Sequence, residues 1–331
     1  MNRKILVTGG AGFIGSHLCE RLLSDGDEVI SLDNFNDFYD PETKRENIDD
    51  IENKFGTESF RSYKGDIRNY EQFLFLLEHE KPDAVIHLAA MAGVRPSLLN
   101  PQLYVDVNVC GTQVLLEACV KKGIRHFIFA SSSSVYGNNA KVPFSEEDRV
   151  DNPISPYAAT KKSGELLCHT YAYLYPIKIF CMRFFTVYGP RQRPDLAIHK
   201  FSKNILAGKE IPFFGDGQTE RDYTYIDDIV DGLIKALESN MALSQNSCCE
   251  IFNLGESRTI SLHAMVACLE KVLGMKAKIK RMPMEPGDVL STYADISKAK
   301  RIFQYAPSVS FEEGVIKFIE WIRRKDLISS K

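Results

Sequence analysis

Short apolar runs alternate with amphipathic stretches along most of the chain. The runs are rich in Val, Ile, Leu and Phe and are bounded by glycine or polar residues, which is typical of buried parallel strands. We expect strands at Lys4–Thr8, Glu28–Leu32, Phe60–Tyr63, Ala84–Leu88, Arg125–Ala130, Lys178–Arg183 and Glu250–Asn253. Apolar residues at helical spacing predict intervening helices at Tyr70–Glu80, Pro101–Lys122, Tyr157–Tyr175 and Ile229–Glu238. Strands that alternate with helices predict an α/β fold built on a doubly wound parallel sheet.

The residue composition of the sequence changes after Arg183. Proline, glycine and charged residues dominate Phe184–Asp222, and a second set of elements follows residue 256. This set comprises helix Ser261–Leu273, strand Ala277–Lys280, the loop Pro283–Asp288 and helix Phe311–Arg324. We therefore predict a smaller α/β domain interleaved with the first. Residues 1–183 and 223–256 would form the sheet domain, and residues 184–222 and 257–331 the smaller one.

Composition and charge exclude several classes of function. The chain has 331 residues, 44% hydrophobic and 26% charged, with a net charge of −3. This charge predicts no binding to nucleic acid or to an acidic membrane. The first apolar run is too short for a signal peptide, and we expect no membrane helix, because no run approaches ~18 apolar residues. The eight cysteines form no C-x-x-C pair and the seven histidines show no ligand spacing. We therefore expect reduced thiols in a cytoplasmic protein and no metal site.

Three glycines follow the first predicted strand and open a helix. Gly9, Gly12 and Gly15 have three-residue spacing, which lets the backbone approach a pyrophosphate at a helix N-terminus. Asp33 comes 18 residues after Gly15, at the end of the next strand. Its carboxylate can bind an adenosine ribose diol and would repel a 2′-phosphate, so the combination predicts a Rossmann-type site for NAD.

A tyrosine and a lysine lie one helical turn apart in the segment after Pro156. Tyr157 and Lys161 would share one helix face. A nearby ammonium lowers the pKa of a phenol, which makes the pair a candidate acid/base device. The alternative is an amphipathic helix with a packed tyrosine and a lysine extended toward solvent. The serine run 131–134, at the end of a predicted strand, adds hydroxyl donors, although at least one of them is expected to bond backbone instead.

Together these motifs resemble the extended short-chain dehydrogenase/reductase family, specifically the NAD-dependent nucleotide-sugar epimerases. The resemblance covers nearly the whole chain. It rests on 8–15 (TGGAGFIG), Asp33-Asn34, Asp66-Ile67, the serines before Val135-Tyr136-Gly137, Tyr157-x-x-x-Lys161 and Arg221-Asp222-Tyr223. By this resemblance the smaller domain would bind the nucleotide sugar.

The resemblance assigns roles to residues of both domains. Tyr157 would be the base, Lys161 would bind the nicotinamide ribose and lower the pKa of the tyrosine, and Ser132 would hydrogen-bond the reacting hydroxyl. The implied NAD contacts are Gly9, Gly12, Phe13, Ile14, Gly15, Asp33, Asn34, Asp66, Ile67, Leu88, Ala89, Ala90, Asn108, Tyr157, Lys161 and Phe184. A homodimer is also implied, through helices Pro101–Lys122 and Tyr157–Tyr175.

The same resemblance narrows the substrate. Related 4,6-dehydratases carry Asp-Glu where this chain has Ser133-Ser134, and two serines cannot supply the acid and base that loss of water needs. The segments 33–40 and 184–195 resemble the UDP-glucuronate 4-epimerase versions. Thr186 and Arg193, with both serines nearby, would bind the C6 carboxylate, for which guanidinium is a two-pronged match. The alternative for Arg193 is a surface ion pair with Asp195.

Two further residues are implied to bind the nucleotide. Arg221 would bind the UDP diphosphate and Asp288 the nucleotide ribose, whereas Glu285 stands where many UDP-galactose 4-epimerases have an arginine. The alternative for Arg221 is an ion pair with Asp222 or Glu220. The sequence thus predicts a UDP-glucuronate 4-epimerase. A 4-epimerase for UDP-glucose or UDP-N-acetylglucosamine, a UDP-glucuronate decarboxylase and a non-catalytic NAD-binding protein remain as alternatives.

Overall fold

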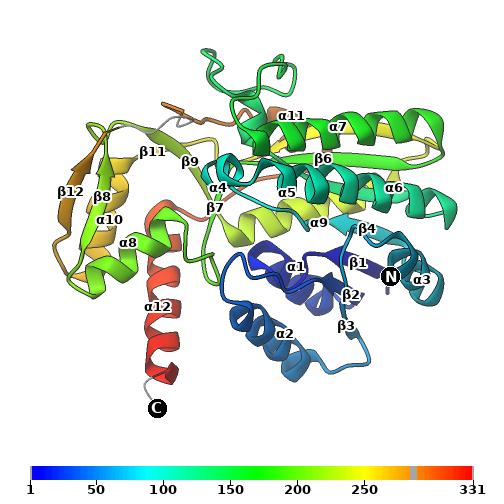
Figure 1. The fold of residues 1–331 in the computed structure, drawn as a ribbon, viewed down its shortest axis with the longest axis horizontal. Coiled ribbons are helices and arrows are strands. Elements are labelled where there is room, and N and C mark those ends of the chain that lie inside the picture. The colour runs from blue at the N-terminus through cyan, green and yellow to red at the C-terminus, as the bar shows by residue number, and fades with distance from the viewer. Residues whose placement is uncertain (1, 284–288, 330–331) are drawn as a thin grey trace.

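A seven-stranded parallel sheet forms the centre of the computed structural model, which describes residues 2–283 and 289–329 (Figure 1). The strand order is β10-β6-β5-β4-β1-β2-β3. The bounds are β1 Lys4–Thr8, β2 Glu28–Asp33, β3 Phe60–Lys64, β4 Ala84–His87, β5 His126–Ser132, β6 Lys178–Phe184 and β10 Cys248–Leu254. The order reverses between β1 and β4, and such a switch point is where open α/β sheets bind ligands. The predicted fold class is confirmed.

Helices cover both faces of the sheet. Helices α1 (Phe13–Ser24), α2 (Pro41–Phe55) and α9 (Ile226–Ala242) pack their apolar side chains into one core. On the other face lie α3 (Tyr70–Glu80), α5 (Pro101–Val105), α6 (Gly111–Lys121) and α7 (Pro156–Leu174). A π-helical turn at Asp106–Cys110 joins α5 to α6, so the predicted helix Pro101–Lys122 is present with an irregular centre. Helix α4 (Val94–Leu99) precedes α5.

One helical stretch within the described residues passes a test for membrane spanning. Pro101–Lys121 is long and apolar enough by length and composition, so the expectation that no stretch approaches this length is wrong. Half of its apolar window is buried inside the protein. A buried core helix passes the same test, and this one packs between α3 and α7.

The smaller part of the molecule lies at the left of Figure 1 and contains two short sheets. Its elements are β7 Thr186–Tyr188, α8 Ala197–Leu206, β8 Glu210–Phe214, β9 Glu220–Tyr225, β11 Thr259–Ser261, α10 Leu262–Leu273, β12 Lys278–Met282 and α12 Phe311–Ser329. Helix α11 (Ser297–Phe303) instead packs against β10 and α9 of the sheet domain. The sheets have the orders β11-β9-β7 and β12-β8. The predicted domain boundary between residues 222 and 223 falls inside β9, which passes directly into α9 of the sheet domain.

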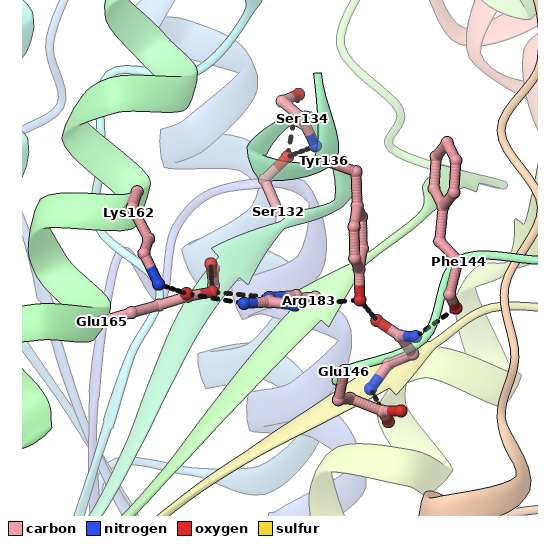
Figure 2. A network of polar contacts seen from close by, with 10 residues as sticks. Ser132, Ser134, Tyr136, Phe144, Glu146, Lys162, Glu165 and Arg183 are labelled. Atoms are coloured by element: carbon pink, nitrogen blue, oxygen red, sulfur yellow. Dashed lines mark hydrogen bonds and ion pairs between the residues drawn. The ribbon is translucent and has the colours of Figure 1, made fainter. Parts of the chain in front are cut away.

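A buried ion pair connects the long helix α7 to the sheet (Figure 2). Arg183 on β6 donates to both carboxylate oxygens of Glu165 at 2.8 and 2.9 Å, and both side chains are 1% exposed. Arg183 also donates to the hydroxyl of Tyr136, which donates in turn to Asn253 on β10. The amide of Asn253 donates to the carbonyl oxygens of Phe144 and Asp295. The buried charges are therefore paired and hydrogen-bonded, as burial requires.

Candidate active site

A cavity of about 470 Å³ opens at the carboxyl ends of the central strands. Most of the predicted site residues line it: Gly9, Gly12, Phe13, Ile14, Gly15, Asp33, Asn34, Ile67, Leu88, Ala89, Ala90, Ser132, Ser133, Ser134, Tyr157, Lys161, Phe184, Thr186 and Arg193. The cavity thus brings the predicted cofactor residues together with the predicted catalytic and carboxylate-binding ones, although they come from distant parts of the chain.

The glycine loop between β1 and α1 approaches its neighbours too closely for side chains. Gly9 has a φ of +74°, and a Cβ there would lie 2.8 Å from the backbone nitrogen of Ala89. A Cβ on Gly15 would lie 2.1 Å from the carbonyl oxygen of Gly9. Helix α1 begins directly after Gly12 without a side-chain cap, so its first N–H groups are available to an anion. These residues fit the pyrophosphate of NAD.

Asp33 lies at the end of β2, beside the glycine loop. Its carboxylate accepts hydrogen bonds from the backbone N–H groups of Ala11 at 3.2 Å and Phe35 at 2.9 Å. Burial raises the pKa of Asp33, and these backbone donors oppose the rise. An acceptor fixed at the end of β2 fits the ribose diol of an adenosine and disfavours a 2′-phosphate.

Helix α7 carries the tyrosine and the lysine. The hydroxyl of Ser155 accepts a hydrogen bond from the N–H of Ala158, and Pro156 occupies the first turn, so the helix starts directly before Tyr157. Lys161 is 4% exposed, and its ammonium donates to the carbonyl oxygen of Ala130 at 2.6 Å. Burial lowers the pKa of Lys161 to about 8.

The environment of the Tyr157 phenol differs from the prediction. Burial raises the pKa of Tyr157, opposed by a hydrogen bond from Ser132 and by the charge of Arg193. The ammonium of Lys161 bonds the backbone of Ala130 instead. The expected lowering of the tyrosine pKa by Lys161 is therefore wrong for this structure, because desolvation outweighs the nearby donors.

All four serines line the cavity, and Ser131 also has a structural role. Ser131 donates to Glu165 at 2.6 Å and so belongs to the buried ion-pair network. The hydroxyl of Ser132 donates to the hydroxyl of Ser134 and accepts from its N–H, both at 3.1 Å (Figure 2). Ser132, Ser133 and Ser134 all line the cavity. The expectation that at least one serine hydroxyl bonds backbone is met by Ser132, which accepts from the N–H of Ser134, whereas Ser131 bonds a side chain.

Arg193 forms the ion pair that was its alternative role and also lines the cavity, while its carboxylate contact stays a prediction. It pairs with Asp195 through bonds of 3.0 and 2.7 Å, yet its side chain is only 16% exposed and lines the cavity. Its guanidinium lies 4.9 Å from the ring centroid of Phe38. The loop before it is fixed from both sides, since His17 of α1 bonds the carbonyl oxygen of Pro190 at 2.9 Å and His199 of α8 bonds that of Gln192 at 2.6 Å.

Four predicted site residues lie elsewhere. Asn108 is buried beneath the cavity wall and bonds the N–H and carbonyl of Met91, which positions the loop rather than lining the cavity. Asp66 pairs with Arg68 beside the cavity. Arg221 lies outside it and donates to the carbonyls of residues 220 and 290. Asp288 lies outside the described residues.

The cavity also contains residues that sequence reasoning missed. Four of them come from the loop between β2 and α2 and from the start of α2: Asn36, Phe38, Tyr39 and Lys44. Within the segment 33–40, the resemblance assigned contacts to Asp33 and Asn34 but to none of the residues after them. The available signal was Lys44 three residues before Asn47, which places both on one face of a helix.

Comparisons with known proteins agree with this geometry. Residues 6–318 match the family model described as GDP-mannose 4,6 dehydratase. The UDP-glucuronate 4-epimerase of Thermodesulfobacterium geofontis (strain OPF15) is 44% identical, over 98% of each chain. The UDP-glucuronic acid 4-epimerase of Bacillus cereus, solved with UDP-glucuronic acid and NAD, is 41% identical over 97% of this chain and 99% of its own, with a TM-score of 0.89.

A further solved structure shows how widely the fold is shared. The UDP-glucose 4-epimerase of Thermotoga maritima, solved with UDP-glucose, is 34% identical over 97% of this chain and 99% of its own, with a TM-score of 0.87. The chain therefore belongs to the GDP-mannose 4,6-dehydratase family of extended short-chain dehydrogenases/reductases, with NAD-dependent UDP-glucuronate 4-epimerases among its relatives.

Proposed function

We propose that the protein is an isomerase that interconverts UDP-glucuronate and UDP-galacturonate by inverting C4 of the sugar. One observation carries the proposal: Arg193 and Thr186 line the same cavity as Ser132, Tyr157 and Lys161. A buried guanidinium beside an acid/base group suits a sugar whose C6 is a carboxylate. The 44% identity to a UDP-glucuronate 4-epimerase supports the same substrate.

The chain's own groups supply the proton transfer. Ser132 orients the C4 hydroxyl, and Tyr157 takes its proton through the shared hydrogen bond between phenol and serine. NAD, when bound, accepts and returns the hydride and adds a positive charge that favours the phenolate. The 4-keto sugar then turns within the cavity, so that the hydride would return to the opposite face of C4, and Tyr157 returns the proton to O4. The reaction consumes no NAD, so we expect the cofactor to stay bound through turnover.

The serines beside Ser132 favour epimerisation over dehydration. Loss of water across C5 and C6 needs an acid and a base at the positions of Ser133 and Ser134. Neither hydroxyl ionises near neutral pH, so they suit hydrogen bonds to a polar or anionic substrate group. The family's description as dehydratases therefore does not extend to this site.

The reaction is tested by proton NMR of UDP-glucuronate with purified enzyme and no added NAD. We expect the anomeric signal of the galacto epimer to appear and to reach an equilibrium with the gluco signal. A xylose signal would identify a decarboxylase. Conversion of UDP-glucose or UDP-N-acetylglucosamine with UDP-glucuronate unchanged would identify a neutral-sugar epimerase, and either result refutes the proposal.

The role of Tyr157 predicts the effect of removing its hydroxyl. We expect Tyr157→Phe to lower kcat by about 10²–10⁴-fold, the usual contribution of general acid–base catalysis, with NAD content unchanged. The control is Tyr173→Phe, on the exposed side of the same helix, which should keep full activity. Full turnover by Tyr157→Phe would contradict the role of Tyr157 as base and would favour a non-catalytic NAD-binding protein.

The carboxylate role of Arg193 predicts a change in substrate preference. A hydrogen bond to a charged group contributes about 1.5–3 kcal/mol, so Arg193→Met should lower kcat/KM for UDP-glucuronate by about 10²-fold and change any activity on UDP-glucose little. A 4-keto uronic acid is also a β-keto acid, and a carboxylate freed from its ion pair can leave as CO₂, so pentose products are assayed in parallel.

Lys200→Met is the matched control for Arg193→Met, because Lys200 is exposed on α8 one turn beyond the loop. It should match the wild type on both substrates. If Arg193→Met neither loses uronate turnover nor releases pentose, the assigned carboxylate contact is refuted.

We also propose a homodimer formed through α5–α6 and α7. These helices contact one another and carry exposed apolar side chains, including Val105 at 40%, Leu166 at 56% and Tyr173 at 84% exposure. An apolar patch of this kind marks an interaction site, and a self-complementary one forms a two-fold dimer. All eight cysteines are free thiols, which suits the reducing cytoplasm, where uronic acid units for polysaccharide synthesis would be made.

The dimer is tested by charge insertion at its proposed centre. Leu166 and Tyr173 lie seven residues apart, two turns along one helix face. We expect the double variant Leu166→Glu/Tyr173→Glu to sediment as a monomer while the wild type sediments as a dimer. The control, Phe75→Glu, changes an apolar side chain on α3 that is 69% exposed away from this patch. A monomeric wild type, or a dimeric double variant, contradicts the proposal.

A further inference from the structure

Lys44 is a buried cation in the cofactor cavity that the catalytic scheme leaves unused. It is 5% exposed, lines the cavity and belongs to the first turns of α2. Its ammonium donates to the carbonyl oxygen and to the side-chain Oδ1 of Asn36, both at 2.9 Å, and lies 4.7 Å from the ring centroid of Tyr39. Among the described residues, no carboxylate forms an ion pair with it. A buried ammonium whose hydrogen-bond partners are neutral, and on which Asp33 and Asp37 act only through space, suits an anionic ligand.

The position of Lys44 relative to the glycine loop follows from its neighbour on the helix. Asn47 lies one turn further along α2, and its amide donates to the carbonyl oxygen of Ala11 at 3.0 Å. The helix face shared by Lys44 and Asn47 therefore points at the loop that holds a pyrophosphate. The charge of Lys44 also interacts with Asp33 on the adenosine side and with Arg193 on the sugar side. Lys44 thus stands between the two ends of the cavity.

The other cations of the cavity have different tasks. The lining residues of the described structure include three, Lys44, Lys161 and Arg193. Lys161 stands beside the Tyr157 phenol and bonds Ala130, and Arg193 is paired with Asp195. The pyrophosphate of a dinucleotide carries two negative charges, and the amino end of α1 offers only about half a unit of positive charge. Of the three lining cations, Lys44 is therefore the one left to balance the negative charge of the pyrophosphate.

We propose that the ammonium of Lys44 binds the pyrophosphate of NAD and governs how tightly the enzyme retains its cofactor. The contact adds a third element, α2, to a site otherwise built from the glycine loop and Asp33. The inference rests on NAD being the resident cofactor. Since NAD must stay bound while the sugar is oxidised and reduced, a charge that slows its release serves the epimerase directly.

The test measures release of NAD rather than turnover. Enzyme loaded with radiolabelled NAD is chased with excess unlabelled NAD, and the dissociation rate is compared among variants. We expect Lys44→Met to release NAD about 10–100-fold faster than the wild type, and Lys44→Arg to stay within a few-fold because the positive charge is kept. The control, Lys54→Met, removes an exposed lysine of the same helix and should leave the rate unchanged.

Competing ligands separate a phosphate contact from a purely structural role. ADP-ribose, which contains the pyrophosphate, should lose affinity for Lys44→Met by the same factor as NAD, whereas adenosine should bind both enzymes equally. An equal loss for adenosine would mean that Lys44 only orders residues 34–39 and would overturn the proposal, as would an unchanged NAD release rate. If the wild type binds no NAD, the cofactor assignment itself fails. Should Lys44→Met not fold, Lys44→Gln takes its place under the same criteria.

Discussion

The buried ion pair between Glu165 and Arg183 is the interaction on which the site's geometry depends. Glu165 lies one turn beyond Lys161 on α7, and Arg183 stands near the end of β6, next to the strand that ends in the serines. Two isolated charges at 1% exposure would be prohibitively costly. The pair therefore tolerates little displacement of α7 along the sheet. Ser131, which bonds the same carboxylate, couples the serine run to that constraint.

The network around this pair also reaches the smaller part of the molecule. Through Tyr136 and Asn253 it continues to the carbonyl oxygen of Phe144 (Figure 2) and to that of Asp295, just before α11. Polar groups buried in such a chain remain stable only when every member has its partner. The network therefore fixes the position of helix α7 relative to the smaller part of the molecule. This suits an enzyme that must present opposite faces of one sugar carbon to the same hydride carrier.

The sequence predicted the sheet well because its strands are apolar, short and separated by clear turn residues. It missed α2, because Pro41–Phe55 is mostly charged and buries little beyond Ile48 and Ile51, so its pattern resembles a solvated loop. Lys44 was missed for the same reason, since its meaning depends on that helix. The pKa of Tyr157 was misjudged because spacing places Lys161 nearby but does not reveal that its ammonium bonds Ala130. Long-range pairs such as Glu165 with Arg183 leave no local pattern.

The residues proposed to select the substrate and those proposed to take part in hydride and proton transfer lie on different elements of this fold. The ends of β1, β2 and β5, with α7, hold the groups that any oxidation of a sugar hydroxyl by NAD requires. Arg193, the proposed carboxylate ligand, stands on the loop after β7. Two histidines fix the backbone of this loop, and so does Glu20, which pairs with Arg191 at 2.5 Å. Burial lowers the pKa of His17 to about 4, so its imidazole stays neutral in the physiological range while Nε2 donates to the carbonyl oxygen of Pro190. His17 and Glu20 belong to α1, the helix proposed to receive the pyrophosphate. The loop proposed to select the sugar is therefore anchored on the proposed cofactor site.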